Sequence, residues 1–172
     1  LNSYIDLSAS NDDFSFNGSV TAYEKLNTAN SDRYEFIFPN YDLSKIIDTN
    51  DKLNGTLSFN SAGSQHYHTT NVTESIVRND LSYSSEDKFL NIGIKNKYNM
   101  LFKNINTKGK NSSKFKEDIE TEILSSFLFE SSYPLIRNGI NFDNFLTPKL
   151  SLRYSPNSMK NLKNNDPRID TN

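Results

Sequence analysis

The chain has 172 residues, which is about the size of one domain. Its formal net charge is −2, so the overall charge does not indicate a nucleic-acid partner. It contains no cysteine, which excludes disulfide frameworks and zinc sites built from thiolates. Only 34% of residues are hydrophobic, against about 45–50% in a typical soluble domain, so a large dry core is not expected. The aromatic content of 12% nevertheless argues against plain disorder.

Hydropathy excludes one class of membrane protein and leaves another open. No run approaches the roughly 18 apolar residues that a transmembrane helix needs. The strands of a transmembrane β-barrel show only alternating hydrophobicity, so the mean hydropathy of −0.70 is compatible with a barrel.

The N-terminal part of the chain predicts a β-hairpin. Apolar and polar residues alternate over residues 1–10 and again over residues 14–23, and the polar turn 11–13 separates the two runs. Because strand side chains alternate between two faces, each run predicts a strand with one apolar and one polar face.

Shorter strand signals follow. A strand over residues 34–38 is expected to end at Pro39, because proline cannot donate to a strand ladder. After a turn at 48–52, the alternation of residues 53–60 predicts another strand. Residues 61–71 are polar and predict a loop.

The middle of the chain continues in the same way. Residues 72–83 carry a weaker strand pattern, and 84–88 predict a turn. Residues 90–102 predict a long strand, and the Lys-, Asn- and Ser-rich residues 104–114 predict a loop.

The stretch 115–156 predicts two long strands joined by a turn at 135–144. The second strand, over 146–155, alternates clearly between apolar and polar residues. The first, over 115–129, also alternates, but four of its apolar residues have helical spacing: Phe115, Ile119, Ile123 and Phe127. We favour a strand because the rest of the chain shows no convincing helix, and a helix is the alternative.

Together these signals predict an all-β fold, an antiparallel meander of about eight amphipathic strands. Several strands have room for ten or more residues, which exceeds the usual 5–6 and matches the roughly 9–11 that cross an outer membrane. Their polar faces would line a wet lumen in a large transmembrane β-barrel, or face solvent in a sandwich.

Six charged residues are candidates for a polar row facing such a lumen: Lys116, Asp118, Glu120, Glu122, Lys149 and Arg153. A solvated face of a soluble strand or helix would explain them equally well. Glu120 and Glu122 could also act as an acid/base pair, but two same-face carboxylates without a pocket are a weak signal.

The sequence predicts no metal site, no cofactor and no enzymatic activity. His66 and His68 are two residues apart and could share one strand face, but no third ligand is recognisable beside them. No Ser-His-Asp order, Gly-rich phosphate loop or metalloprotease motif is present. Polar loop residues are therefore the preferred interpretation of the two histidines.

A resemblance to a known family rests on the C-terminal stretch. The turn Tyr133-Pro134-Leu135 leads to a strand of the form L-x-P-x-x-x-L-x-Y-x-P, and a polar segment with Asn165, Asp166 and Asp170 follows. The strand motif includes Leu146, Pro148, Tyr154 and Pro156. This pattern resembles the mid-barrel signature of the LPS-assembly protein family, also called LptD, OstA or organic solvent tolerance proteins, and the run 34–41 is similar to another strand of that family.

The resemblance implies a place and a role. The chain would be an internal fragment of the outer-membrane β-barrel of a Gram-negative bacterium, covering residues 1–172, without a complete N-terminal jellyroll domain. The barrel would insert lipopolysaccharide into the outer leaflet, without covalent chemistry. Its partners would be lipopolysaccharide, an LptE-like plug lipoprotein, a periplasmic LPS bridge protein and membrane lipid.

Two other functions fit the residues. One is a porin or nutrient-receptor barrel, which would show solute uptake and no lipoprotein plug. The other is a secreted β-rich adhesin or binding module, which would be soluble without detergent and carry scattered outward aromatic residues. A barrel fragment is not expected to fold alone, since it leaves two strand edges unpaired.

Overall fold

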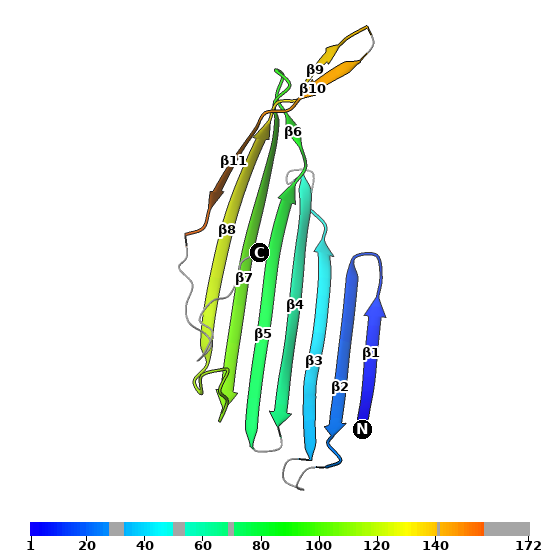
Figure 1. Cartoon of the computed structure of the whole chain (residues 1–172), viewed down its shortest axis with the longest axis vertical. Helices are drawn as coiled ribbons and strands as arrows, with labels where there is room; N and C mark the ends of the chain where they lie inside the picture. Colours follow the sequence, from blue (N-terminus) through cyan, green and yellow to red (C-terminus); the bar gives the residue numbers. More distant parts are fainter. Residues whose placement is uncertain (28–32, 50–53, 69–70, 141, 157–172) are drawn as a thin grey trace.

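A computed structural model describes residues 1–27, 33–49, 54–68, 71–140 and 142–156, and all regular structure within them is β-strand (Figure 1). No helix in this part of the chain is long and apolar enough to cross a membrane. The strands are β1 (Asn2–Ser10), β2 (Phe14–Glu24), β3 (Tyr34–Ile47), β4 (Gly55–His68), β5 (Val72–Ser85), β6 (Lys88–Phe89), β7 (Lys95–Lys110), β8 (Glu120–Ser132), β9 (Leu135–Asn138), β10 (Asp143–Leu146) and β11 (Lys149–Tyr154).

The strands form one long antiparallel meander, which confirms the predicted all-β class and the predicted meander. The sheet order is β1-β2-β3-β4-β5-β7-β8-β11, with β6 paired to β7. Strands β9 and β10 form a separate hairpin that extends beyond the upper end of the sheet in Figure 1. Over the described residues the sheet is open, with β1 and β11 at its edges, and it does not close into a barrel.

Strand β3 continues through the proline that was expected to end it. It runs from Tyr34 to Ile47, and its pairing with β4 shifts register between Ile37 and Asn40. Pro39 lies in this irregularity, where a residue without an N–H does not interrupt a regular ladder. The prediction that the strand stops at Pro39 is therefore wrong.

Two segments predicted as loops are strand. Residues 61–68 belong to β4, and residues 104–110 belong to β7. Both are polar on each face, so they lack the alternation that marks a half-buried strand. In contrast, residues 90–94, expected to begin a long strand, connect β6 to β7.

Within 115–156 the only regular structure of the described residues is β-strand, so the helical alternative for the first part is wrong. Strand β8 begins at Glu120 rather than at Phe115. The predicted turn at 135–144 overlaps the hairpin of β9 and β10, in which Leu135 pairs with Leu146. The predicted second strand, over 146–155, corresponds mainly to β11, because Leu146 ends β10 and β11 begins at Lys149.

The sheet has one apolar and one polar face, because paired residues of neighbouring strands lie on the same side. One paired row of the apolar face consists of Phe14, Lys45, Phe59, Leu81, Phe102 and Ser125. The adjacent paired row, displaced by one residue along each strand, faces the polar side. It consists of Ser15, Ser44, Asn60, Asp80, Lys103 and Leu124. Lys45 shows that the apolar face is not wholly free of charge.

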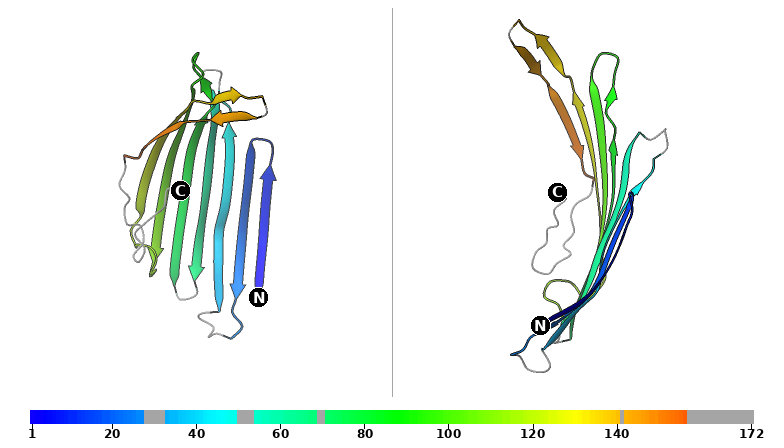
Figure 2. Two further views of the ribbon diagram at one scale, coloured as in Figure 1. Left: turned by 45° about the horizontal axis from the view of Figure 1, so that its top comes forward. Right: turned by 90° about the vertical axis from the view of Figure 1, so that its right-hand side faces the viewer.

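The polar face is the more crowded of the two. Ile105 and Leu124, which lie on it, are 5% and 4% exposed, and Glu122 is 2% exposed. On the apolar face, large side chains such as Phe102 and Leu152 are open to the surroundings. The edge-on view in Figure 2 shows a curved sheet. Since side chains crowd together on the inside of a curve, we infer that the polar face is concave.

The apolar face carries a stripe of large side chains that crosses the strands diagonally. On β1 the stripe contains Ile5 and Leu7, and the paired row of Leu7 reaches Asn106 on β7. On β11 it is centred on Leu152, whose row reaches Tyr98 on β7. Between β1 and β11 the stripe therefore shifts by eight residues along the strand direction, which is about 26 Å. Across the sheet, the same interval covers seven strand-to-strand steps, which is about 34 Å. Its direction lies about 40° from the perpendicular to the strands.

A hydrogen-bonded row of polar side chains crosses the apolar face; we call it the amide ladder, and its members are Tyr41, Ser61, Asn79, Asn104, Asn106 and Thr121. Ser61 Oγ donates to Asn79 Oδ1 at 2.8 Å, and Asn79 Nδ2 donates to Asn104 Oδ1 at 3.2 Å. Thr121 Oγ1 donates to Asn106 Oδ1 at 2.8 Å. The ladder links β3, β4, β5, β7 and β8 and satisfies polar groups on a face that is otherwise largely apolar.

Candidate functional site

Four of the six charged residues predicted to form a polar row lie on the polar face. Glu120 and Glu122 are on β8, and Lys149 and Arg153 are on β11. The strand pairing puts all four on the same side of the sheet. Glu122 is buried, whereas Lys149 and Arg153 are exposed at the sheet edge. Arg153 Nε donates to Ser126 Oγ on β8 at 3.3 Å.

The other two residues of the predicted row are outside the strands. Lys116 and Asp118 lie in the connection between β7 and β8. Lys116 Nζ still reaches the row, because it contacts Glu120 Oε1 at 3.0 Å. The six residues do not form one row. Arg153 and Lys149 pair with Leu128 and Ser132, which are six and ten residues along β8 from Glu122, about 20 and 33 Å.

A small charged hollow lies at the upper end of the polar face. It has a volume of about 190 Å³ and is lined by Lys95, Lys97, Lys149, Glu130 and Asp87, together with three serines. Lys95 Nζ is 2.6 Å from Asp87 Oδ2. Lys95 and Lys97 lie within the strand predicted over residues 90–102, but only the pairing of β7, β8 and β11 brings them beside Lys149.

A larger hollow lies on the polar face of strands β1 to β5. Its volume is about 540 Å³, and small polar residues such as Ser19, Asn40 and Ser64 line it, with Asp42 and Arg78 at its walls. Sequence reasoning did not find this site, because it depends on curvature across five strands rather than on any local motif. Hydroxyl and amide groups of this kind suit hydrogen bonding to a hydrated or sugar-like ligand.

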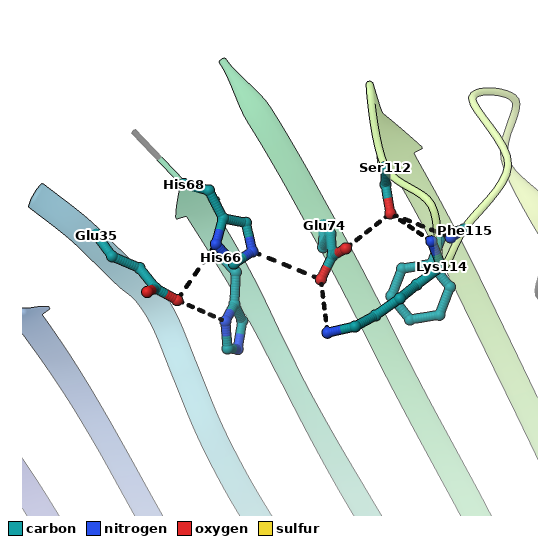
Figure 3. Close-up of polar contacts among 7 residues, drawn as sticks. All are labelled: Glu35, His66, His68, Glu74, Ser112, Lys114 and Phe115. Atoms are coloured by element: carbon teal, nitrogen blue, oxygen red, sulfur yellow. Dashed lines mark hydrogen bonds and ion pairs between the residues drawn. The ribbon is translucent and has the colours of Figure 1, made fainter. Parts of the chain in front are cut away.

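A cluster of two imidazoles and two carboxylates lies at the lower end of the polar face (Figure 3). Glu35 Oε1 on β3 is 3.3 Å from His68 Nδ1 and 3.9 Å from His66 Nδ1, both on β4. Glu74 Oε2 on β5 is 3.6 Å from His68 Nε2. The structure confirms that the two histidines share a face, and it places both in a strand rather than in the loop that was predicted.

Contacts from the β7–β8 connection hold Glu74 in place (Figure 3). Ser112 Oγ donates to Glu74 Oε1 at 2.7 Å, and Lys114 Nζ lies 3.4 Å from Glu74 Oε2. The same Ser112 Oγ accepts hydrogen bonds from the backbone N–H groups of Lys114 and Phe115. Glu74 is therefore oriented by a structured loop.

The motif residues behind the family resemblance are distributed over three short strands. Leu135 begins β9, and Leu146 ends β10. Tyr154 ends β11, where it pairs with Phe127 on the apolar face of the main sheet. The other four motif residues lie just outside these strands: Tyr133, Pro134, Pro148 and Pro156. The downstream residues Asn165, Asp166 and Asp170 lie outside the described part of the chain.

Comparison with known proteins found no similar protein. No family model, no curated protein and no solved structure matches this chain.

Proposed function

We propose that this chain forms part of the wall of an outer-membrane β-barrel that inserts lipopolysaccharide into the outer leaflet. The barrel part of the proposal rests on the geometry of the sheet. The lipopolysaccharide part rests on the resemblance carried by the 133–156 stretch, and the hollows of the polar face are chemically compatible with it.

The diagonal apolar stripe is the observation that carries the proposal. Strands of outer-membrane barrels tilt by about 35–45° from the membrane normal, so a membrane-parallel band crosses them obliquely. The stripe on this sheet is inclined by about 40°, which agrees with that tilt. The stripe is not uniform, because Lys45 lies in the paired row of Leu81 and the amide ladder crosses the same face; the proposal rests on the overall slope between β1 and β11.

Strand length supports the same assignment. A hydrophobic band about 25 Å tall needs about 9–11 residues of a tilted strand. Strands β2, β3, β4, β5, β7 and β8 have 11, 14, 14, 14, 16 and 13 residues. Strands β3, β4, β5, β7 and β8 are long enough to cross the band and extend beyond it. Strand β2 is just long enough, and β11, with six residues, is too short to cross it.

The polar face suits the hydrophilic part of an amphiphile. Its larger hollow offers hydroxyl and amide groups, and its smaller hollow offers Lys95, Lys97 and Lys149. Lysine is a common phosphate-binding residue, and the sugar-phosphate part of lipopolysaccharide carries phosphates. An apolar outer face and a polar inner face are what passage of such a molecule through a barrel requires.

The test uses the intact protein that contains this chain, in its native bacterium. The protein should be recovered in the outer membrane, should need detergent for extraction and should migrate differently on gels before and after heating. Its depletion should leave newly made lipopolysaccharide in the inner membrane. A soluble, heat-insensitive protein would contradict the barrel, and normal surface delivery after depletion would contradict the transport role alone.

Complementation with variants connects the phenotype to the polar face. A Lys97→Glu, Lys149→Glu variant places two acids in the smaller hollow and should restore surface lipopolysaccharide less well than the unaltered protein. Lys108→Glu, Lys110→Glu, with two charge reversals on the opposite face of β7, is the matched control. Equal rescue by both variants would argue against phosphate binding in this hollow.

A further inference from the structure

We propose that Glu35, His66 and His68 form a binding site for a divalent transition-metal ion of the zinc type. Each of the three residues offers one ligand atom, and these atoms lie within 4.8 Å of one another. Nothing in the proposed transport role requires such a site, so the inference is independent of it.

The ligand set matches the chemistry of zinc. Two imidazole nitrogens and one carboxylate oxygen form a three-residue set that leaves a fourth position for water, as in open zinc sites. At zinc–ligand distances of about 2.0–2.1 Å, tetrahedral geometry places ligand atoms about 3.3–3.4 Å apart. The separation of Glu35 Oε1 from His68 Nδ1 is 3.3 Å, and that from His66 Nδ1 is 3.9 Å.

Strand geometry supplies the two histidines as a pair. Residues two apart on one strand project from the same face, and the rings of His66 and His68 are 6.0 Å apart between centroids. Glu35 comes from the adjacent strand, and its carboxylate faces the Nδ1 atoms of both histidines (Figure 3). Only a modest approach of the two rings is needed for all three atoms to reach one ion.

Glu74 has the position of an outer carboxylate that orients a metal-binding histidine. Metal-binding imidazoles commonly use their second nitrogen to donate to a carboxylate, which fixes the tautomer and increases ligand basicity. His68 presents Nδ1 to Glu35 and Nε2 to Glu74. Ser112 and Lys114 fix Glu74 from the far side, so this second nitrogen faces a prearranged acceptor.

The use of histidine supports a site rather than a chance contact. The chain has only two histidines, and both lie in this cluster. The three residues are partly buried, with side-chain exposures of 24% to 34%, so an ion from solution could reach them. Magnesium and calcium prefer oxygen ligands, so a set with two nitrogens favours a transition metal over either.

The proposal is tested on the intact protein, purified in detergent without a polyhistidine tag. Zinc is titrated by calorimetry, and cobalt serves as a spectroscopic probe of tetrahedral nitrogen and oxygen ligation. We expect one ion per chain with a dissociation constant in the micromolar range or tighter, and displacement of cobalt by zinc. Magnesium should not compete.

Variants assign the binding to these residues. His68→Ala and Glu35→Gln should each weaken zinc binding by at least about tenfold, and Glu74→Gln should weaken it by about 10–100-fold through the orientation of His68. Asp42→Asn, on the same strand and face as Glu35, is the charge-matched control and should bind zinc normally. Circular dichroism checks that each variant keeps the β-structure of the unaltered protein.

Two results would overturn the proposal. One is the absence of saturable zinc binding by the folded, unaltered protein at micromolar concentrations. The other is binding that His68→Ala and Glu35→Gln leave unchanged, since the ion would then be held elsewhere.

Discussion

Leu81 on β5 lies where the diagonal stripe crosses its strand, and it tests the membrane assignment directly. In its paired row it lies between Phe59 and Phe102, and its side chain is 38% exposed on the apolar face. If this face contacts lipid, Leu81→Arg places a cation near the bilayer midplane. That change should destabilise the folded protein by about 2–4 kcal/mol.

Thr73 is the matched control on the same strand and face. It is eight residues from Leu81, about 26 Å along the strand, which at a tilt of about 40° is about 20 Å along the membrane normal. Half of a 25 Å band is about 12 Å, so Thr73 lies outside the hydrocarbon. Thr73→Arg should therefore cost only about 0–1 kcal/mol.

The measurement is unfolding of the intact protein by guanidinium in lipid vesicles, followed by heat-dependent gel migration. The expected result is a difference of about 2 kcal/mol or more in the free energy of unfolding between the two variants. On a solvated surface, both substitutions would fall within about 0.5 kcal/mol of the unaltered protein. Equal effects at the two positions would refute the inference that the stripe is a membrane band.

Two further predictions concern packing on the apolar face. Asn79→Leu removes the central member of the amide ladder and leaves Ser61 and Asn104 without their hydrogen bonds to it, so the free energy of unfolding should fall by about 1 kcal/mol in a denaturant titration. An unchanged value would show that the ladder adds nothing to stability. Gly63→Ala should destabilise by about 1–3 kcal/mol, because its new methyl group would meet the Tyr41 ring at 2.6 Å, whereas Gly18→Ala, where the Phe16 ring is 3.1 Å away, should cost less. Equal unfolding midpoints for the two alanine variants would contradict this packing argument.

Local alternation was enough to predict the strands that carry a clear apolar face. The hairpin of β1 and β2 was found where the pattern placed it, and β5 was also found although its pattern is weaker. The method failed where both faces are polar, as in residues 61–68 and 104–110, because a strand without a hydrophobic side resembles a loop in composition. Residues 61–68 and 104–110 are strand because their backbones hydrogen-bond to neighbouring strands, and this pairing is not visible in a local sequence pattern.

The candidate sites required contacts between distant residues. The pairing of His66 with His68 on one face followed from their spacing, and the structure confirmed it. Glu35 is 31 residues before His66 in the sequence, and it joins the cluster only because β3 pairs with β4 across a register shift. Lys149 joins Lys95 and Lys97 only because β11 and β7 both pair with β8.

The amide ladder has a consequence for how the strands find their partners. A slip of one residue between neighbouring strands exchanges the two faces, and burial alone opposes it. A slip of two residues keeps every side chain on its own face, so alternation of polarity does not oppose it. Such a slip between β4 and β5 would place Ser61 opposite Val77 or Leu81 and break its bond to Asn79. The ladder thus penalises the one misalignment that an amphipathic sheet would otherwise tolerate.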